Sequence, residues 1–303
     1  MKSTTVRRVT LSIAAATALT GVAACSSSGS GEGDGAAGQG ATRVSPISAL
    51  RSAEQSTDRA DSAKVVSTTT IGTLMSMEAH GTLAWGHGLT GTLTLTYTGG
   101  SLADTMRRLD SSSMQARYLP DAYYARMGDR FARQADGKHW LRYGYDDLAT
   151  LAGGSGAYLK EQMQNTTPNQ SVKLLLASGD VKKVGEATVA GQHTTHYAGT
   201  VNVDDLAAEN SHLTRNQLDQ LRKQLTQAGV STETVDIWVN DQNLLVKQVS
   251  QAQMAMGRMT QTAYYTHYGV KVSAQQPPAS DTEDFKDLLK KRGGTFGGTG
   301  TTS

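Results

Sequence analysis

His193 and His196, in the stretch GQHTTHYAG, form the arrangement in this sequence that most resembles a metal site. Two histidines at this spacing can bind zinc when both lie on one face of a helix. The surrounding residues favour a strand, however, and residues three apart in a strand point to opposite faces. No cysteine or carboxylate accompanies them in a ligand-like pattern. We therefore expect His193 and His196 to be structural residues of a strand, and we predict no metal site.

Other arrangements that could carry catalysis are incomplete. The segment GGSGA at residues 153–157 resembles a nucleophile elbow but lacks its final glycine and the apolar strand that should precede it. The acidic pairs Asp146-Asp147 and Asp204-Asp205 each precede a Leu-Ala pair, which is typical of acids at the start of a helix. The sequence contains neither a P-loop nor a dinucleotide fingerprint. We expect no catalytic residue and no cofactor; a hydrolase with dispersed catalytic residues is the alternative that a converging Ser, His and acid would support.

Cys25 is the only cysteine in the chain, and it is placed where a thiol has one well-defined use. A basic start is followed by the short apolar segment Val9–Ala24, as in a secretory signal. That segment is shorter than the roughly 20 apolar residues of a comfortable membrane span. The letters VAAC at residues 22–25 match the lipobox, in which the cysteine thiol receives diacylglycerol. We predict a signal peptide at residues 1–24 and lipidation of Cys25; a secreted protein with an incidental thiol is the alternative.

The segments that flank the middle of the chain predict its domain boundaries. Residues 25–44 comprise the lipidated cysteine and a Ser/Gly-rich linker, and residues 293–303 have the composition of a disordered tail. One domain is expected at residues 45–292. Loss of residues 1–24 would remove three of the 29 basic side chains and none of the 27 acidic ones, which changes the net charge from +2 to −1. This balance does not favour nucleic acid as a partner. The pair Arg7-Arg8 hints at twin-arginine export, but its context favours the general secretory route.

The middle of the chain reads as a strand-rich domain with a few helices. Ser45-Pro46 has the residue types of a cap and first position of a helix. Period-two alternation predicts strands at residues 62–70, 74–85, 89–98, 114–119, 122–127, 140–143, 184–189, 193–203 and 259–269. A hairpin across residues 240–243 is predicted within residues 233–256. Helices are predicted at residues 157–164, 171–178 and 214–228. Runs of strands with helices between them predict an α+β fold with a mostly antiparallel, widely curved sheet.

Methionine is the residue type whose placement is least ordinary. Among the nine methionines after Met1, Met75, Met77, Met114, Met127, Met254 and Met256 fall within predicted strands, and Met259 begins another. Methionine is flexible and polarisable, and surfaces that accept varied apolar ligands often use it. The alternative is that these side chains fill gaps in a core. Sequence alone leaves both interpretations open.

Three stretches of the later part of the chain form a recognisable series: VGEATVAGQHTTHYAGTVNVD, TVDIWVNDQNLLVKQVS and YYTHYGVKVSAQQPP. In these stretches, and most specifically at TTHY and DIWVN, the chain resembles the actinobacterial LppX/LprG lipoprotein family. The resemblance spans about Ser62 to Pro278. It implies the half-barrel fold of the LolA and LolB carriers, in which helices cover the concave side of a strongly curved antiparallel sheet. It also implies an apolar cavity for lipid acyl chains and an acylated cysteine, which here is Cys25.

These expectations combine into a non-enzymatic, membrane-anchored lipoprotein that binds or carries an amphiphile. The partners would be the membrane, through the diacylglyceryl-cysteine, and a lipid or lipoglycan ligand, with an envelope transporter as a further candidate. The protein would work at the extracytoplasmic face of the cell membrane. The alternation of the strands predicts that the cavity is lined by Met75, Met77, Leu83, Leu93, Leu95, Met254 and Met256. The alternative is an envelope interaction or sensor-accessory lipoprotein whose concave side is filled by its own side chains.

Overall fold

The computed structural model describes residues 45–151, 167–202 and 229–291, together with residues 160, 163, 164, 219, 222, 223 and 226. Contacts divide the chain into residues 1–42 and residues 43–303, and every described residue belongs to the second unit. The predicted signal peptide, Cys25, the linker and the tail lie outside the described residues, as do the segment at 153–157 and Asp204-Asp205. Most of the predicted helices 157–164 and 214–228 also lies outside, although the few residues described from them are helical.

The described part of the chain begins with helix α1 (Pro46–Arg59), whose start is the one predicted. The hydroxyl of Ser45 accepts a hydrogen bond from the backbone N–H of Ser48 at 3.2 Å, and proline occupies the first turn. Leu50, Ala53 and Thr57 are buried, so one stripe of the helix faces the core. The hydroxyl of Thr57 also accepts a hydrogen bond from the backbone N–H of Leu245, which ties α1 to a strand 188 residues further along.

The first half of the sheet starts as an antiparallel meander. Strands β1 (Ser62–Ile71), β2 (Met75–Ala84) and β3 (Thr90–Gly99) follow one another and confirm the strands predicted at residues 62–70, 74–85 and 89–98. The chain then continues through α2 (Gly100–Arg108), β4 (Ser113–Tyr118), β5 (Ala122–Arg126), α3 (Asp129–Ala132), β6 (Trp140–Gly144) and α4 (Tyr145–Leu151). Asp146 and Asp147 lie in the first turn of α4, as predicted for acids at a helix start.

The second half of the sheet follows helix α6 (Pro168–Ala177), which confirms the helix predicted at residues 171–178. Its strands are β7 (Lys182–Val189), β8 (Gln192–Asn202), β9 (Thr232–Asn240), β10 (Leu245–Met254) and β11 (Gly257–Thr266). The predicted turn between β9 and β10 is present. The side-chain oxygen of Asn240 accepts hydrogen bonds from the backbone N–H groups of Gln242 and Leu244, and Asn243 adopts a positive φ of 58°.

The end of the described chain adds elements that the sequence pattern did not predict. A 3₁₀ turn, η1 (Ala279–Asp281), leads into β12 (Thr282–Asp284) and α9 (Phe285–Lys291). Strand β12 pairs in parallel with β6. The carboxylate of Glu283 accepts hydrogen bonds from Lys138 at 2.6 Å and Lys291 at 2.9 Å. One ion pair to a residue 145 positions away and one within the segment itself therefore hold it in place.

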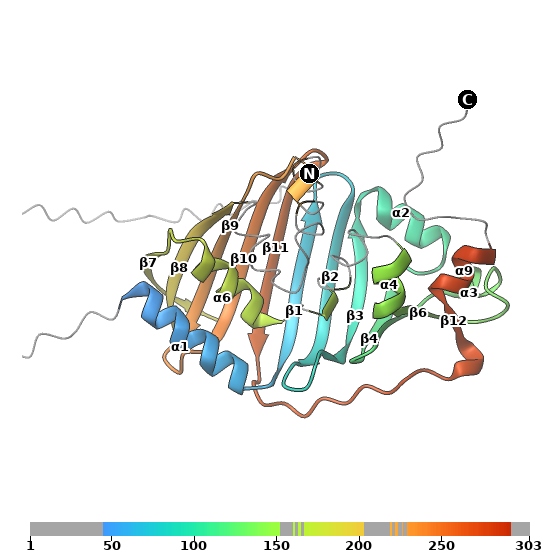
Figure 1. Cartoon of the computed structure of the whole chain (residues 1–303), viewed down its shortest axis with the longest axis horizontal. Coiled ribbons are helices and arrows are strands. Elements are labelled where there is room, and N and C mark those ends of the chain that lie inside the picture. The colour runs from blue at the N-terminus through green and yellow to red at the C-terminus, as the bar shows by residue number, and fades with distance from the viewer. Residues whose placement is uncertain are drawn as a thin grey trace, which may run out of the picture. The chain divides into compact units, whose positions relative to one another are not determined.

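The strands form one open, curved, twelve-stranded sheet in the order β12-β6-β5-β4-β3-β2-β1-β11-β10-β9-β8-β7 (Figure 1). All pairings are antiparallel except β12 with β6, so the predicted fold class is confirmed. Buried residues of α1, α4 and α6 share one hydrophobic core with one side of the sheet, which we call the inner face. At one edge, the register of β7 with β8 shifts between Lys183 and Gly185.

Candidate functional site

The inner face is a broad apolar surface built by alternation along many strands. Its members pack in one core with the helices: Ala63 and Val65 of β1, Ala79 and Leu83 of β2, Leu93 and Leu95 of β3, Met114 and Ala116 of β4, Tyr197 and Val201 of β8, Val235, Ile237 and Val239 of β9, and Ala263 and Tyr265 of β11. On each strand these residues lie two or four positions apart, as residues on one face of a pleated sheet must. An apolar wall therefore extends over both halves of the sheet.

The predicted cavity residues occupy different places relative to this wall. Leu83, Leu93 and Leu95 are buried within the inner-face core, and Met77 packs against it. Met75 is half-buried at the start of β2, next to Met77 on the same face. Met254 is half-buried at the end of β10, where it shares its face with the buried Ser250 and Ala252.

Met256 differs from the other predicted cavity residues. It lies in the turn between β10 and β11, and 56 % of its surface is exposed. Nothing in the structure tests whether any of these side chains contacts a ligand, so the cavity lining stays a prediction.

Three polar residues of β9 and β10 interrupt the apolar wall. Gln248 and Ser250 alternate on the inner side of β10, and Glu233 on β9 lies opposite Ala252. Burial raises the pKa of Glu233, while a hydrogen bond with the Ser250 side chain opposes that rise. Gln248 is only 8 % exposed, and its side-chain oxygen has no hydrogen-bond partner among the described residues. Sequence reasoning did not single these residues out, because polar residues at inward positions look the same as polar residues at outward ones.

A group of tyrosines lines the inner side of β4, β5 and β6. The rings of Tyr118 and Tyr123 have centroids 5.1 Å apart, and Tyr143 continues the group at 5.8 Å from Tyr123. Phe285 of α9 packs on Tyr143 with centroids 4.7 Å apart. Burial raises the pKa of both Tyr118 and Tyr143 to about 12. Their hydroxyls are neutral at pH 7, and this end of the wall is rich in aromatic side chains.

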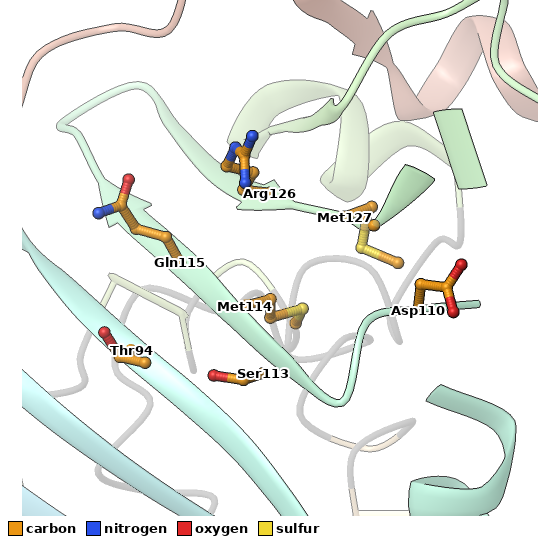
Figure 2. A pocket seen from close by; sticks show the side chains of 8 residues that line it. Thr94, Asp110, Ser113, Met114, Gln115, Arg126 and Met127 are labelled. Atoms are coloured by element: carbon orange, nitrogen blue, oxygen red, sulfur yellow. The ribbon is translucent and has the colours of Figure 1, made fainter. Parts of the chain in front are cut away.

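A pocket of about 360 Å³ opens where β4 and β5 separate (Figure 2). Strand β4 stays paired with β3 as far as Ser113, but its pairing with β5 ends at Ala116 and Ala125. Strand β5 instead remains paired with β6 through Arg126. We call the resulting opening the window. Figure 2 shows the side chains of Met114 and Met127 extending into it.

The far end of the window is closed by a second contact, between the residues that precede β4 and the residues that follow β5. The hydroxyl of Ser111 accepts a hydrogen bond from the backbone N–H of Gly128 at 2.9 Å. A Cβ atom on Gly128 would lie 2.0 Å from the backbone oxygen of Asp110, so only glycine permits this approach. Arg130 reinforces it by donating to the backbone oxygen of Arg108 at 3.2 Å. The window is therefore framed at both ends, and its remaining lining is Thr94, Ser113, Gln115 and Arg126.

The two histidines lie in strand β8, as predicted, and have different partners. His193 is exposed and lies 2.9 Å from the carboxylate of Asp241, and this contact raises the pKa of His193. His196 lies 2.7 Å from the carboxylate of Asp236. The histidines therefore do not converge on a common point. Within the part of the chain that is described, no group of three or more His, Cys, Asp or Glu side chains is placed to hold a metal ion.

The motifs TTHY and DIWVN meet on the outer face of the sheet. The ring of His196 stacks on Trp238 with centroids 4.2 Å apart and planes 7° apart. The ammonium group of Lys247 lies 4.2 Å from the centre of the Trp238 ring on the other side. These residues are direct neighbours across β8, β9 and β10. They hold the strands in register and lie on the side opposite the inner face.

No helix within residues 45–151, 167–202 and 229–291 is long and apolar enough to cross a bilayer.

Comparison with known proteins shows that the chain is similar to two Streptomyces proteins. It is 50 % identical over 259 residues to a 31.2 kDa protein of Streptomyces griseus encoded in the rplA–rplJ intergenic region, with 85 % of each chain covered. It is 46 % identical over 310 residues to a Streptomyces coelicolor protein named "Putative lipoprotein SCO4650", with 97 % of this chain and 100 % of that one covered. No family profile matches the chain.

Solved structures similar to the chain include the mycobacterial lipoprotein LppX, which belongs to the family that the sequence resembles, and a second mycobacterial protein, LprF. LppX of Mycobacterium tuberculosis aligns with a TM-score of 0.45 and 16 % identity, covering 75 % of this chain and 98 % of LppX. LprF of Mycobacterium bovis aligns with a TM-score of 0.44 and 13 % identity, covering 77 % of this chain and 96 % of LprF. The likeness is one of fold.

Proposed function

The chain belongs to the same protein family as the SCO4650 protein of Streptomyces coelicolor, and from this premise we propose that it is a lipoprotein that binds an amphiphile. In this proposal Cys25 carries a diacylglyceryl group at the extracytoplasmic face of the cell membrane. Residues 26–44 are the linker, and the domain at residues 45–292 is the binding part. The lipobox letters at residues 22–25 and the name of the relative support the anchor.

The observation that carries the ligand proposal is the apolar inner face beneath the helices. Buried leucines of β2 and β3 form its middle, and half-buried methionines lie at the ends of β2 and β10. A lipid chain that leaves water for such a surface gains about 0.8 kcal/mol per CH₂. About 14 methylenes would then gain roughly 11 kcal/mol, which is comparable with the 4–15 kcal/mol that association costs. One long acyl chain is therefore about the smallest ligand that this mode of binding can retain.

The proposed activity is binding and transfer without covalent chemistry. The ligand's chain occupies the inner face, and its polar group remains where side chains can hydrogen-bond it. Glu233, Gln248 and Ser250 supply such groups within the wall, and the window supplies others. The linker lets the domain reach lipid in the membrane that holds it.

Native mass spectrometry of the chain from residue 26 onward tests the proposal. This protein lacks the anchor but keeps the whole unit of residues 43–303, which contains its own sheet and core. The expected result is a mass increment that corresponds to a bound lipid, and uptake of a fluorescent fatty acyl probe after that lipid is removed. A protein that is isolated without lipid and takes up no acyl probe would instead support the interaction-module alternative.

Met254 and Met256 give a matched pair of variants for locating the binding face. Met254→Glu places a charge beside buried inner-face residues, whereas Met256→Glu places it in an exposed turn two residues away. We expect Met254→Glu to weaken uptake of the acyl probe at least tenfold, because a charge in an apolar site costs more than 1.4 kcal/mol. Met256→Glu should have the smaller effect. Equal uptake by Met254→Glu and the unaltered protein would remove the inner face of β10 from the binding site.

A further inference from the structure

The window between β4 and β5 is a break in the pairing of two neighbouring strands of the sheet. Residues 113–115 of β4 have β3 on one side and no paired strand on the other, because β5 stays with β6 beyond Ala125. The contact between Ser111 and Gly128 then closes the far end. Because both ends are tied, the opening is a fixed feature of the sheet and not a frayed edge.

The lining of the window changes from polar to apolar across the thickness of the sheet. Arg126 and Gln115 alternate with inner-face residues and so belong to the outer face, together with Thr94 of β3. Met114 belongs to the inner-face core, and Met127 packs against the same core. A molecule that occupies the window can therefore meet hydrogen-bonding groups at its outer end and thioether side chains at its inner end.

Arg126 supplies positive charge at the outer end. It is exposed, and it forms no ion pair with any residue of the described ranges. The carboxylates around it are engaged elsewhere: Asp110 lies 3.6 Å from Arg130, and Asp281 accepts hydrogen bonds from the backbone N–H and ring of His139 at 2.8 Å. The charge of Arg126 nevertheless contributes to the lowered pKa of Asp281, after the larger effect of His139. The guanidinium group is thus available to an anionic ligand.

From this arrangement we propose that the window binds the anionic head group of an amphiphile whose acyl chain passes between Met114 and Met127 to the inner face. The inference rests on the proposed function, since it gives the same ligand an entrance and a head-group class. A volume of about 360 Å³ is at the lower end of the range for small-molecule sites, which suits a phosphate or carboxylate head better than a large glycan. Arginine pairs with phosphate and carboxylate oxygens in the bidentate geometry that favours it over lysine.

Two probes that differ only in the phosphate test the head-group assignment: 1-oleoyl lysophosphatidic acid and 1-oleoylglycerol. They are titrated into the chain from residue 26 onward, into Arg126→Gln, and into Arg133→Gln as the control. Arg133 is also exposed and forms no ion pair with a described residue, but it lies in the turn after α3. The unaltered protein should prefer the phosphate probe. Arg126→Gln should weaken binding of that probe about tenfold, as for loss of one charge-assisted hydrogen bond, and leave oleoylglycerol unchanged.

The outcomes separate the two proposals. If oleoylglycerol binds to all three proteins but Arg126→Gln and Arg133→Gln weaken the phosphate probe equally, the window is not the head-group site while lipid binding stands. The same conclusion follows if the unaltered protein shows no preference for the phosphate. If neither probe binds to the unaltered protein, the proposed function itself fails.

A fluorescent dye reports on the window directly. Gln115→Cys places the only thiol of the shortened chain on the window, and Thr200→Cys places it on an exposed outer position of β8 as the control. Binding of lysophosphatidic acid should shift the emission of a polarity-sensitive dye on Gln115→Cys and leave the dye on Thr200→Cys unchanged. A shift of equal size at both sites, or at neither, would overturn the placement of the ligand.

Discussion

Replacement of Glu283 by glutamine should destabilise the fold more than the small size of β12 suggests. The carboxylate lies between two ammonium groups, at 2.6 Å from Lys138 and 2.9 Å from Lys291, and its side chain is 3 % exposed. The amide of glutamine can accept from one lysine only, and its NH₂ group faces the other. Breaking a buried ion pair lowers the free energy of unfolding by about 3–5 kcal/mol. Because Lys291 is 52 % exposed, we expect Glu283→Gln to lower it by about 2–3 kcal/mol.

Urea unfolding followed by circular dichroism measures this loss. With a slope near 3 kcal/mol per molar, the midpoint should fall by roughly 1 M. Lys290→Gln is the matched control, because Lys290 neighbours Lys291 and, among the described residues, forms its ion pair with Asp287 at an exposed site on the same helix. That change should cost no more than about 0.5 kcal/mol. The reasoning is refuted if Glu283→Gln costs as little as Lys290→Gln.

The pH dependence gives a second check on the same pair. Hydrogen bonds from Lys138 and Lys291 lower the pKa of Glu283 in the folded protein, whereas the unfolded chain has the usual value of about 4.3. The unfolded state therefore binds the proton more readily as the pH falls. The contribution of Glu283 is complete above about pH 5 and is lost as the pH drops through the folded-state pKa. The stability difference between the unaltered protein and Glu283→Gln should shrink accordingly below pH 4.

Three further predictions address other parts of the domain. Glu233→Gln should raise the melting temperature at pH 7 but not at pH 4, because burial raises the pKa of Glu233 and its ionised form opposes folding; an equal effect at both pH values would contradict this. Thr57→Val should cost about 1–2 kcal/mol in urea unfolding, since it leaves the buried backbone N–H of Leu245 without its acceptor; no loss would show that water replaces the hydroxyl. Gly128→Ala should force the chain away from Asp110, and faster hydrogen exchange at residues 110–115 and 126–128 than elsewhere in the sheet is the expected signature; unchanged exchange there would count against the closed window.

The alternation of side chains predicted most of the fold because each long strand buries one face. The pattern of Leu93 and Leu95 among threonines is an example, since the burial that it implies is the burial that the structure shows. Helix α2 was missed because only Ala103 and Met106 are buried in it, too few to produce a helical period among its polar residues. Strand β12 was missed because three residues carry no period, and what holds Glu283 in place is a lysine 145 residues away.

The candidate site was less predictable than the fold. Periodicity predicted that Leu83 faces inward, and Leu83 lies in the inner-face core, but periodicity could not show that Met256 would fall in a turn. The window depends on which neighbouring strand pairs with β5 beyond Ala125: β5 remains hydrogen-bonded to β6 and separates from β4. The local sequence of β5 does not indicate which of the two pairings persists. Whether a ligand occupies either place is a question of binding, which neither alternation nor pairing answers.

Among the described residues the sheet has two unpaired edges, and these would matter for the membrane-anchored protein proposed above. An open sheet offers unpaired backbone groups at its edges, and copies held at one membrane would meet far more often than copies in solution. One edge strand, β12, has only three residues and is followed at once by α9. The other, β7, carries Lys182 and Lys183 and a register shift that disturbs its regular hydrogen-bonding row. Both edges are thus poor templates for strand addition, and this allows a wide sheet to remain open at high local density without aggregating through its edges.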